Sequence, residues 1–379
     1  MPELFLTIFF ISILLIFLGT GIWVALSMVG VSAIGMLLFT SRPVGDAMAT
    51  TIWGTSSSWT LTALPLFVWM GEILFRTKLS ENLFKGLAPW MSRLPGGLIH
   101  VNVVGCALFA AISGSSAATV ATVGKMSIPE LRKRNYPEKL LLGSLAGSGT
   151  LGLLIPPSII LIIYGVTVQE SIAKLFIAGI IPGIMIAIFF MFYVIGWSIL
   201  NKNIMPKMEE TFSFSQKIKQ SGQLIPVIVL IVAVIGSIYV GIATATEAAS
   251  LGVVGALILS FFQKSLNKET FKLSLLGATK TSCMIAFILA GSAFLSLAMG
   301  FTGLPRNLAI WINEMNLSPY VLIMVLTIFY IILGMFLDGI SAVVLTMAII
   351  EPMIRQAGFD MIWFGVFLVI VVEMAQITP

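Results

Sequence analysis

The chain has 379 residues, of which 58% are hydrophobic and only 10% are charged. A soluble domain carries about 25% charged residues, so this composition excludes a soluble globular protein and predicts a chain that lies largely in lipid. The net charge of +5 does not indicate a nucleic-acid partner, because the basic residues lie in short loops between apolar runs, where they set membrane topology.

Apolar runs follow one another along the whole chain, and each predicts a helix. The first run lacks the basic flank and the small-residue cleavage site of a signal peptide, so we expect a transmembrane helix there. The predicted fold class is an all-α polytopic membrane protein. The runs lie approximately at 3–19, 22–39, 61–75, 97–112, 117–126, 139–168, 172–200, 223–241, 246–262, 281–299, 320–337, 340–350 and 361–377.

Two pairs of runs are too short to span a membrane singly and break at a glycine-containing tip. The first pair, 97–126, breaks at 113–116, and the second, 320–350, breaks at 338–341. Irregular backbone at membrane depth is tolerated only where protein or a water-filled cavity satisfies its polar groups. We therefore expect two re-entrant helical hairpins. The run 139–168 is predicted to be a broken helix.

The basic residues orient this arrangement. If the N-terminus lies outside and each hairpin returns to the side it entered from, nearly all of the 21 lysines and arginines fall on the inner side. This distribution fits the positive-inside rule and predicts a periplasmic N-terminus. The polar stretch 201–222 is then a cytoplasmic linker that divides the chain into halves. The outer side holds Arg42, Lys174, Arg306 and Arg355.

The two halves share an ordered set of residues. Pro129 is followed by an aromatic residue and by Pro156, and Pro352 is followed in the same spacing by an aromatic residue and by Pro379. A Leu-Ala-x-Trp run precedes each hairpin, at 87–90 and 308–311. We expect the first proline of each set to end its hairpin. Because the first hairpin opens inward and the second outward, the repeats are predicted to be inverted, as in secondary transporters with a midplane site.

The first tip and the break that follows it predict a cation site. Helix breaks free backbone carbonyls and point helix N-termini inward, and uncharged oxygen ligands suit Na⁺ better than a divalent ion. We expect the break at 147–152, ahead of the Pro-Pro pair. Close helix packing is the alternative role for these small residues. The predicted Na⁺ site 1 comprises Ser113, Gly114, Ser115, Ser116, Gly149, Thr150 and Gly152, and the predicted substrate contacts are Ser116, Thr119, Pro156 and Ser158.

The second half supplies carboxylates. Asp338 lies at the second tip and Glu373 takes the place of Thr150 in the repeat, and intramembrane acids indicate function by default. Glu72 and Glu247 lie near predicted membrane boundaries and favour structural roles. The predicted Na⁺ site 2 comprises Asp338, Gly339, Ser341, Glu373, Gln376 and Thr378.

The sequence contains no Walker phosphate loop and no HExxH motif or Cys/His cluster. We therefore expect no enzymatic activity, no catalytic residues, no cofactor, and no metal other than Na⁺ as the coupling ion. A membrane-embedded enzyme is the alternative from a different functional class.

Several segments together resemble a known family. These are 113–119, 128–131, 154–158 with Tyr164-Gly165, and 337–339 with 377–379. They are similar to the large membrane subunit (DctM/SiaM-like) of tripartite ATP-independent periplasmic (TRAP) transporters, over nearly the whole chain. The resemblance implies Na⁺-coupled symport of a small organic acid, such as a C4-dicarboxylate or sialic acid, across the bacterial inner membrane. It also implies an elevator-type fold, a small four-helix membrane subunit and a periplasmic substrate-binding protein as partners.

Two features depart from the family pattern. Asn135 stands where the family usually has glycine, and asparagine also tolerates a left-handed helix cap. The sequence stops at Pro379, where the family continues, so we expect a C-terminally truncated form of a longer protein. A carrier of similar fold without a soluble partner is the nearest alternative.

The resemblance and the repeat together divide the chain into parts. The expected parts are a scaffold with the first arm at 1–96, the first transport repeat at 97–200, the linker at 201–222, a second scaffold and arm at 223–319, and an incomplete second transport repeat at 320–379.

Overall fold

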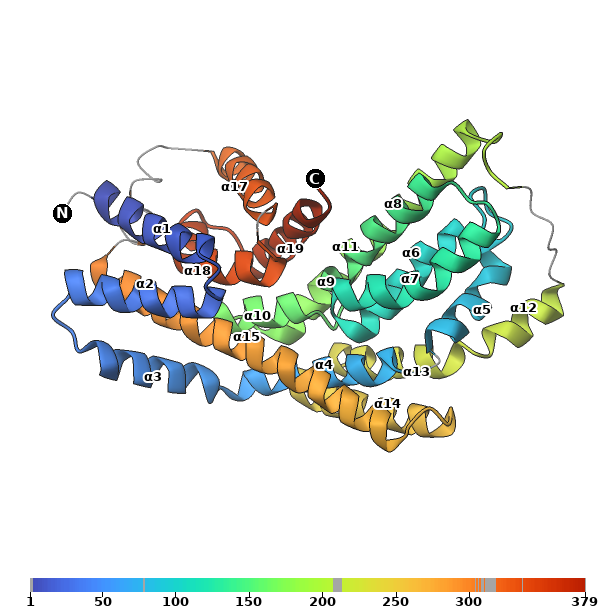
Figure 1. The fold of residues 1–379 in the computed structure, drawn as a ribbon, viewed down its shortest axis with the longest axis horizontal. Helices are drawn as coiled ribbons and strands as arrows, with labels where there is room; N and C mark the ends of the chain where they lie inside the picture. The colour runs from blue at the N-terminus through green and yellow to red at the C-terminus, as the bar shows by residue number, and fades with distance from the viewer. Residues whose placement is uncertain are drawn as a thin grey trace. The chain divides into compact units, whose positions relative to one another are not determined.

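The computed structural model describes residues 3–77, 79–206, 213–303, 305, 307, 310, 318–335 and 337–378. Every regular element in these residues is a helix, which confirms the predicted all-α fold class (Figure 1). Five helices of the described residues are long and apolar enough to cross a membrane, or up to seven elements if each bent helix pair counts as one span. The Leu-Ala-x-Trp run at 308–311 lies outside the described residues except for Ile310, as does Pro379.

The chain forms two compact units, each built from separate stretches of sequence. The first unit comprises Met1–Thr62, Ile162–Ser171 and Thr281–Pro379, and the second comprises Ala63–Leu161 and Ile172–Lys280. This division groups separate stretches of the chain by their packing, whereas the predicted division cuts the chain into consecutive scaffold and transport segments. The predicted division stays a prediction, as does the inverted orientation of the halves.

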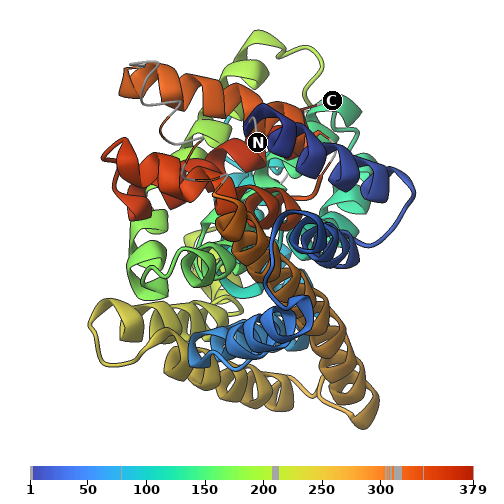
Figure 2. The ribbon, with the colours of Figure 1, turned by 90° about the vertical axis from the view of Figure 1, so that its left-hand side faces the viewer.

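The first unit packs around the second part of helix α15. Gly291 of α15 lies against α2, where an added Cβ would come within 2.8 Å of the Ala25 carbonyl oxygen. Ser292, the next residue, donates a hydrogen bond of 2.7 Å to the Val344 carbonyl of α18. The N-terminal helices α1 and α2 also pack on each other (dark blue in Figure 2). The helices of this unit are α1 (Glu3–Gly19), α2 (Val24–Phe39), α3 (Val44–Ser56), η1 (Trp59–Thr62), the end of α10 (Ile159–Thr167), most of α15 (Lys268–Thr302), α17 (Pro319–Gly334), α18 (Gly339–Gln356) and α19 (Met361–Ile377).

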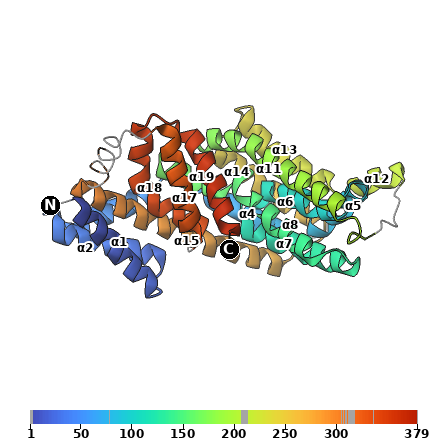
Figure 3. The same ribbon diagram turned by 90° about the horizontal axis from the view of Figure 1, so that it is seen from above.

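The second unit contains the first hairpin and its neighbours. Its helices α4 and α14 lie side by side, and α6, α7 and α8 pack on one another (Figures 1 and 3). Gly252 of α14 permits the close approach of α14 to α4, since it lies directly against Met70 of α4. The helices are α4 (Ala63–Phe75), α5 (Leu79–Met91), α6 (Ile99–Ser113), α7 (Ser116–Lys133), α8 (Glu138–Gly149), α9 (Leu151–Leu154), α11 (Ile172–Leu200), α12 (Phe214–Ser221), α13 (Ile225–Tyr239) and α14 (Ala245–Phe262), with the start of α10 and α15.

The prolines expected to end the hairpins lie inside helices, so that prediction was wrong. Pro129 lies within α7 and Pro352 within α18, and both helices continue by a further turn. Proline removes one backbone hydrogen bond and bends a helix, but packing on neighbouring helices can hold the remaining turns together. The helices end instead at left-handed residues, Asn135 with φ 58° and Gly358 with φ 79°.

The local structures of the two repeats match closely when they are aligned on Pro129 and Pro352. Helices α7 and α18 then cover the same 18 positions. After Asn135, the Tyr136 N–H donates to the Leu131 carbonyl at 3.0 Å, and the corresponding bond after Gly358 is 3.2 Å. Both ends are therefore Schellman turns, in which Asn135 and Gly358 both adopt the left-handed conformation.

Several helices escaped the sequence analysis because they are polar or amphipathic. Helix α3 and the first part of α15, from Lys268, lie between the predicted apolar runs, and α12 lies within the predicted linker. Trp90 of α5 contacts α12, where its indole N–H donates to the Ser221 hydroxyl at 2.6 Å. The structural roles of Glu247 and Glu72 are confirmed: Glu247 completes a capping box at the start of α14, and Glu72 pairs with Arg76 at 3.0 Å.

Candidate functional site

The first hairpin tip is held by a left-handed glycine. Gly114 has φ 60° and closes α6, with its N–H bonded to the Ala110 carbonyl at 3.1 Å. An added Cβ would lie 2.5 Å from the Pro157 carbonyl oxygen, and the Gly114 carbonyl accepts from the Ile159 N–H at 3.2 Å. The tip therefore rests directly on the non-helical stretch that joins α9 to α10.

A chain of hydroxyl and carbonyl oxygens surrounds the start of α7. Ser115 is the N-cap, and its hydroxyl accepts from the Ala118 N–H at 3.5 Å. The Ser115 carbonyl accepts from the Thr119 hydroxyl at 2.8 Å, and the Thr119 hydroxyl lies 2.9 Å from that of Ser113. Ser113 and Thr119 are both buried. These contacts concentrate uncharged oxygen atoms at one point of the fold.

Helix α9 lies against this tip because Gly152 allows it. A Cβ at Gly152 would fall 2.7 Å from the carbonyl carbon and oxygen of Ser115 and 2.8 Å from the Ser116 nitrogen. The Ser116 hydroxyl reaches the Thr150 carbonyl at 3.5 Å, and the Thr150 hydroxyl donates to the Gly147 carbonyl at 2.8 Å. The structure thus brings together all seven residues of the predicted Na⁺ site 1 at the junction of α7, α8 and α9.

The break itself lies later than the sequence predicted. Residues 147–152 stay helical, with Thr150 at φ −64° and ψ −23° between α8 and α9. The helix stops at Ile155, and the chain is irregular until α10 begins at Ile159. Consecutive prolines lack the N–H donors that a helix needs, so they interrupt the helix. The glycines before them serve the close approach to the tip.

The predicted substrate residues lie at the same junction. Ser158 is buried, donates to the Leu153 carbonyl and accepts from the Leu161 N–H at 3.3 Å, so its hydroxyl bridges the break. Pro156 and Thr119 are buried as well, and Ser116 is half-buried. Of these four residues, only Ser116 is partly exposed.

The second tip has a charged cap in place of a neutral one. Asp338 is exposed, and its carboxylate accepts from the Ser341 N–H at 3.2 Å at the start of α18. Gly339 and Ser341 are buried. When the repeats are aligned on their prolines, Asp338 takes the position of Ser115, and both are N-caps.

The remaining residues of the predicted Na⁺ site 2 lie at the end of α19. Glu373 is buried, with 3% of its surface exposed, whereas Gln376 and Thr378 are exposed. The Thr378 hydroxyl donates to the Met374 carbonyl at 2.7 Å. This set is spread over the start of α18 and the end of α19, two helices that pack on each other. It is therefore less concentrated than the first set.

A cavity that the sequence analysis missed lies within the first unit. Its volume is about 450 Å³, and no motif marks the residues around it. One wall is the end of α3 with η1 and the loop between them, and the other is the end of α10 with the turn that follows it. Its polar lining comprises Thr55, Ser58, Thr60, Gln169 and Glu170.

The comparison with known families identifies the family of the chain. The model of the DctM component of tripartite ATP-independent periplasmic transporters matches residues 9–379. The chain belongs to this family. The resemblance stated from the motifs is thereby confirmed, and the DctM family is one of transporters rather than enzymes. Together with the apolar helices, membership makes the chain a multi-pass protein of the bacterial inner membrane.

Relatives of known name span most of the chain. The C4-dicarboxylate large permease DctM of Pseudomonas aeruginosa is 31% identical over 92% of this chain and 81% of its own length. The 2,3-diketo-L-gulonate large permease YiaN of Escherichia coli is 31% identical, over 88% and 78% respectively. The isethionate permease DctMQ of Oleidesulfovibrio alaskensis is 28% identical, over 96% of this chain and 57% of its own length.

A solved structure supports the fold of this DctM-family chain. The Neisseria gonorrhoeae protein MtrF, described as illuminating a class of antimetabolite efflux pumps, superposes with a TM-score of 0.55 over 88% of this chain and 73% of its own. The two sequences are 13% identical, so the likeness concerns the fold alone.

Proposed function

We propose that this chain is the large membrane subunit of a Na⁺-coupled symporter that takes up a small organic acid across the inner membrane. The named relatives act on C4-dicarboxylates, 2,3-diketo-L-gulonate and isethionate, all of them small anions. Large permeases of this family work with a small membrane subunit and a periplasmic binding protein, and the relative called DctMQ is longer than this chain alone. We assign both kinds of partner, the small one with four helices, to this chain.

The observation that supports Na⁺ as the coupling ion is a pair of long hydrogen bonds at the first tip. The hydroxyls of Ser115 and Ser116 each lie 3.5 Å from their partners, at the limit of a hydrogen bond. Their oxygens, with the Thr150 carbonyl, can therefore turn to a cation at little cost. Uncharged oxygens held on glycine-rich backbone suit Na⁺, which is cargo here and no resident cofactor. At the second tip, Asp338 would give the predicted Na⁺ site 2 a charged ligand.

The same junction suggests how binding and movement are linked. A tip that rests on a helix break through backbone contacts can shift as one piece with that break. We therefore propose an elevator mechanism, in which the repeats at 97–200 and 320–379 move against a scaffold formed by 1–96 and 223–319. The substrate would bind beside Ser116, where the α7 N-terminus offers backbone N–H groups to a carboxylate.

Uptake into proteoliposomes tests the proposal. The complete large subunit, the small membrane subunit and the adjacent binding protein are reconstituted, and labelled C4-dicarboxylate, diketogulonate and isethionate are supplied outside. We expect uptake that requires an inward Na⁺ gradient and the binding protein. Equal uptake when K⁺ replaces Na⁺ would contradict the coupling, and equal uptake without the binding protein would favour the partner-free carrier.

The charge of Asp338 provides a sharper test of the second site. Asp338→Asn keeps an N-cap oxygen and removes the charge, so the helix should form as before while a cation loses a ligand. We expect the Na⁺ concentration for half-maximal uptake to rise by about threefold to tenfold, the size of one charge-assisted contact. Asp360→Asn is the matched control, since Asp360 also caps a helix, accepting from the Trp363 N–H at 2.8 Å. If wild type and Asp338→Asn needed the same Na⁺ concentration for half-maximal uptake, Asp338 would not be a Na⁺ ligand.

A further inference from the structure

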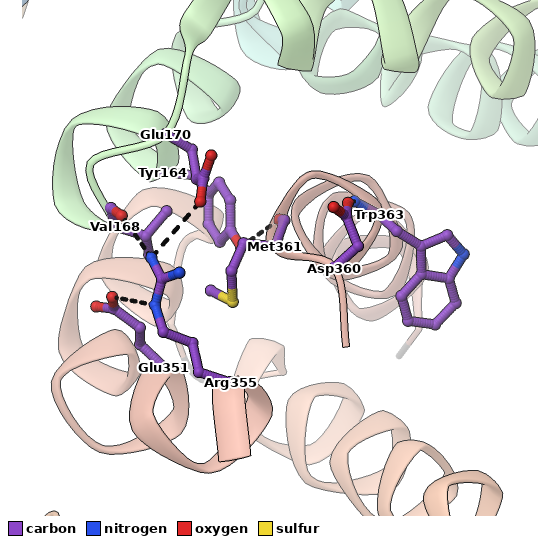
Figure 4. Close-up of polar contacts among 8 residues, drawn as sticks. All are labelled: Tyr164, Val168, Glu170, Glu351, Arg355, Asp360, Met361 and Trp363. Atoms are coloured by element: carbon purple, nitrogen blue, oxygen red, sulfur yellow. Dashed lines mark hydrogen bonds and ion pairs between the residues drawn. The ribbon is translucent and has the colours of Figure 1, made fainter. Parts of the chain in front are cut away.

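Two hydrogen bonds join the end of helix α10 to the α18–α19 junction, which consists of the last turn of α18 and the first residue of α19 (Figure 4). The Tyr164 hydroxyl donates to the Met361 carbonyl at 2.7 Å, and the Arg355 guanidinium donates to the Val168 carbonyl at 2.9 Å. Tyr164 is fully buried. The first repeat's broken helix and the second repeat's hairpin are therefore in direct contact at this point.

The α10 terminus is shaped to receive Arg355. Gln169 has φ 58°, and the Glu170 N–H donates to the Gly165 carbonyl at 2.9 Å, so α10 ends in a Schellman turn. The last carbonyls of a helix lack partners within it and carry partial negative charge, which attracts a cation. Arg355 meets one of these carbonyls, that of Val168.

Two carboxylates orient the Arg355 side chain. Glu351, one turn earlier on α18, lies 3.0 Å from it, and Glu170 lies 3.6 Å from it. The Arg355 side chain is 46% exposed, and exposed ion pairs contribute little to stability. The carboxylates therefore aim the guanidinium more than they stabilise the fold. Glu170 also lines the cavity described above.

The first repeat shows that this turn does not require such a tie. Arg132 takes the position of Arg355 when the repeats are aligned on their prolines, and it pairs with Glu138 across its own turn. Both turns keep the same Schellman geometry, whichever partner the arginine takes. The contact of Arg355 with α10 is therefore an additional feature of the second repeat.

Helix α10 is bonded at both ends. Its first residue, Ile159, donates to the Gly114 carbonyl of the first tip, and its last turn holds Arg355 and Met361. We propose that Arg355 is a positioning residue that, with Tyr164, clasps α10 to the α18–α19 junction, so that cation occupancy at the first tip affects the second hairpin. This inference rests on the proposed Na⁺ coupling for its consequence, but its structural part stands independently.

Hydrogen exchange tests the clasp without any transport. Amide exchange is measured by mass spectrometry on the complete protein in nanodiscs, for wild type, Arg355→Ala and the repeat-matched control Arg132→Ala. We expect exchange in 164–170 to accelerate by about tenfold in Arg355→Ala, the loss expected for one charged hydrogen bond, and to stay unchanged in Arg132→Ala. Unchanged exchange in Arg355→Ala, with the protein folded, would overturn the clasp.

Uptake then tests the positioning role. We expect Arg355→Ala to raise the Na⁺ concentration for half-maximal uptake about threefold to tenfold, with Arg355→Lys in between because lysine keeps the charge and one donor. Arg132→Ala should match wild type. Faster exchange in 164–170 with an unchanged Na⁺ dependence would overturn the positioning role. If wild-type uptake ignored Na⁺, the proposed coupling would fail, and with it the positioning role, while exchange would still decide the clasp.

Discussion

Substitution of Gly152 by alanine is expected to reduce uptake by about a hundredfold. The added Cβ would lie within 2.8 Å of three backbone atoms of the first tip, and neither the tip nor α9 can give way without opening the junction. Overpacking of a well-packed interior costs about 1–3 kcal/mol, and backbone neighbours place this case at the upper end. Uptake should therefore fall by about a hundredfold, on the scale of 1.4 kcal/mol per tenfold.

The control for this substitution lies on the neighbouring helix. Gly143→Ala on α8 adds the same methyl group where nothing lies within 4 Å, and alanine favours a helix by about 1 kcal/mol over glycine. Uptake by both variants is compared at equal amounts of folded protein in the membrane. Wild-type uptake by Gly152→Ala would show that α9 does not need to approach the tip so closely.

Gly114→Ala is expected to have the next largest effect, through two separate costs. An L-residue at φ 60° loses about 1–2 kcal/mol to left-handed strain. The added Cβ would also lie 2.5 Å from the Pro157 carbonyl oxygen, so the tip must lift from the break. We expect the melting temperature to fall and uptake to drop by at least about tenfold for the steric part, which exceeds 1 kcal/mol.

Gly241→Ala separates these two costs. Gly241 has φ 76°, in the turn between α13 and α14, but nothing lies within 4 Å of the added Cβ. Its substitution should lower the melting temperature through strain alone and leave uptake per folded molecule unchanged. If both variants behaved alike, the contact between the first tip and the break would be of no consequence for transport.

The helices and the two tips could be predicted from the sequence because their signals are local. Apolar runs predict most helices, and the glycines and serines at 113–116 mark a tip that the structure places as expected. The Schellman turn at Asn135 also follows from a local preference for left-handed backbone. The role of each residue at the junction depends on contacts between distant segments, and residue type alone does not reveal them.

The misses have definite physical causes. Polar and amphipathic helices such as α3 and α12 contain no apolar run, so hydropathy does not mark them. Pro129 was read as a helix end, although a packed helix tolerates one missing hydrogen bond. The glycines around Thr150 were read as a break, although their lack of side chains serves close approach. The clasp at Arg355 joins residues far apart in sequence, and no local pattern signals it.

The shared N-cap position of the two hairpins has a consequence for the charge of each tip. Ser115 and Asp338 hold the same backbone in the same way, and serine and aspartate are nearly equal as caps. A single substitution at this position therefore changes the electrical charge of a tip and leaves its shape intact.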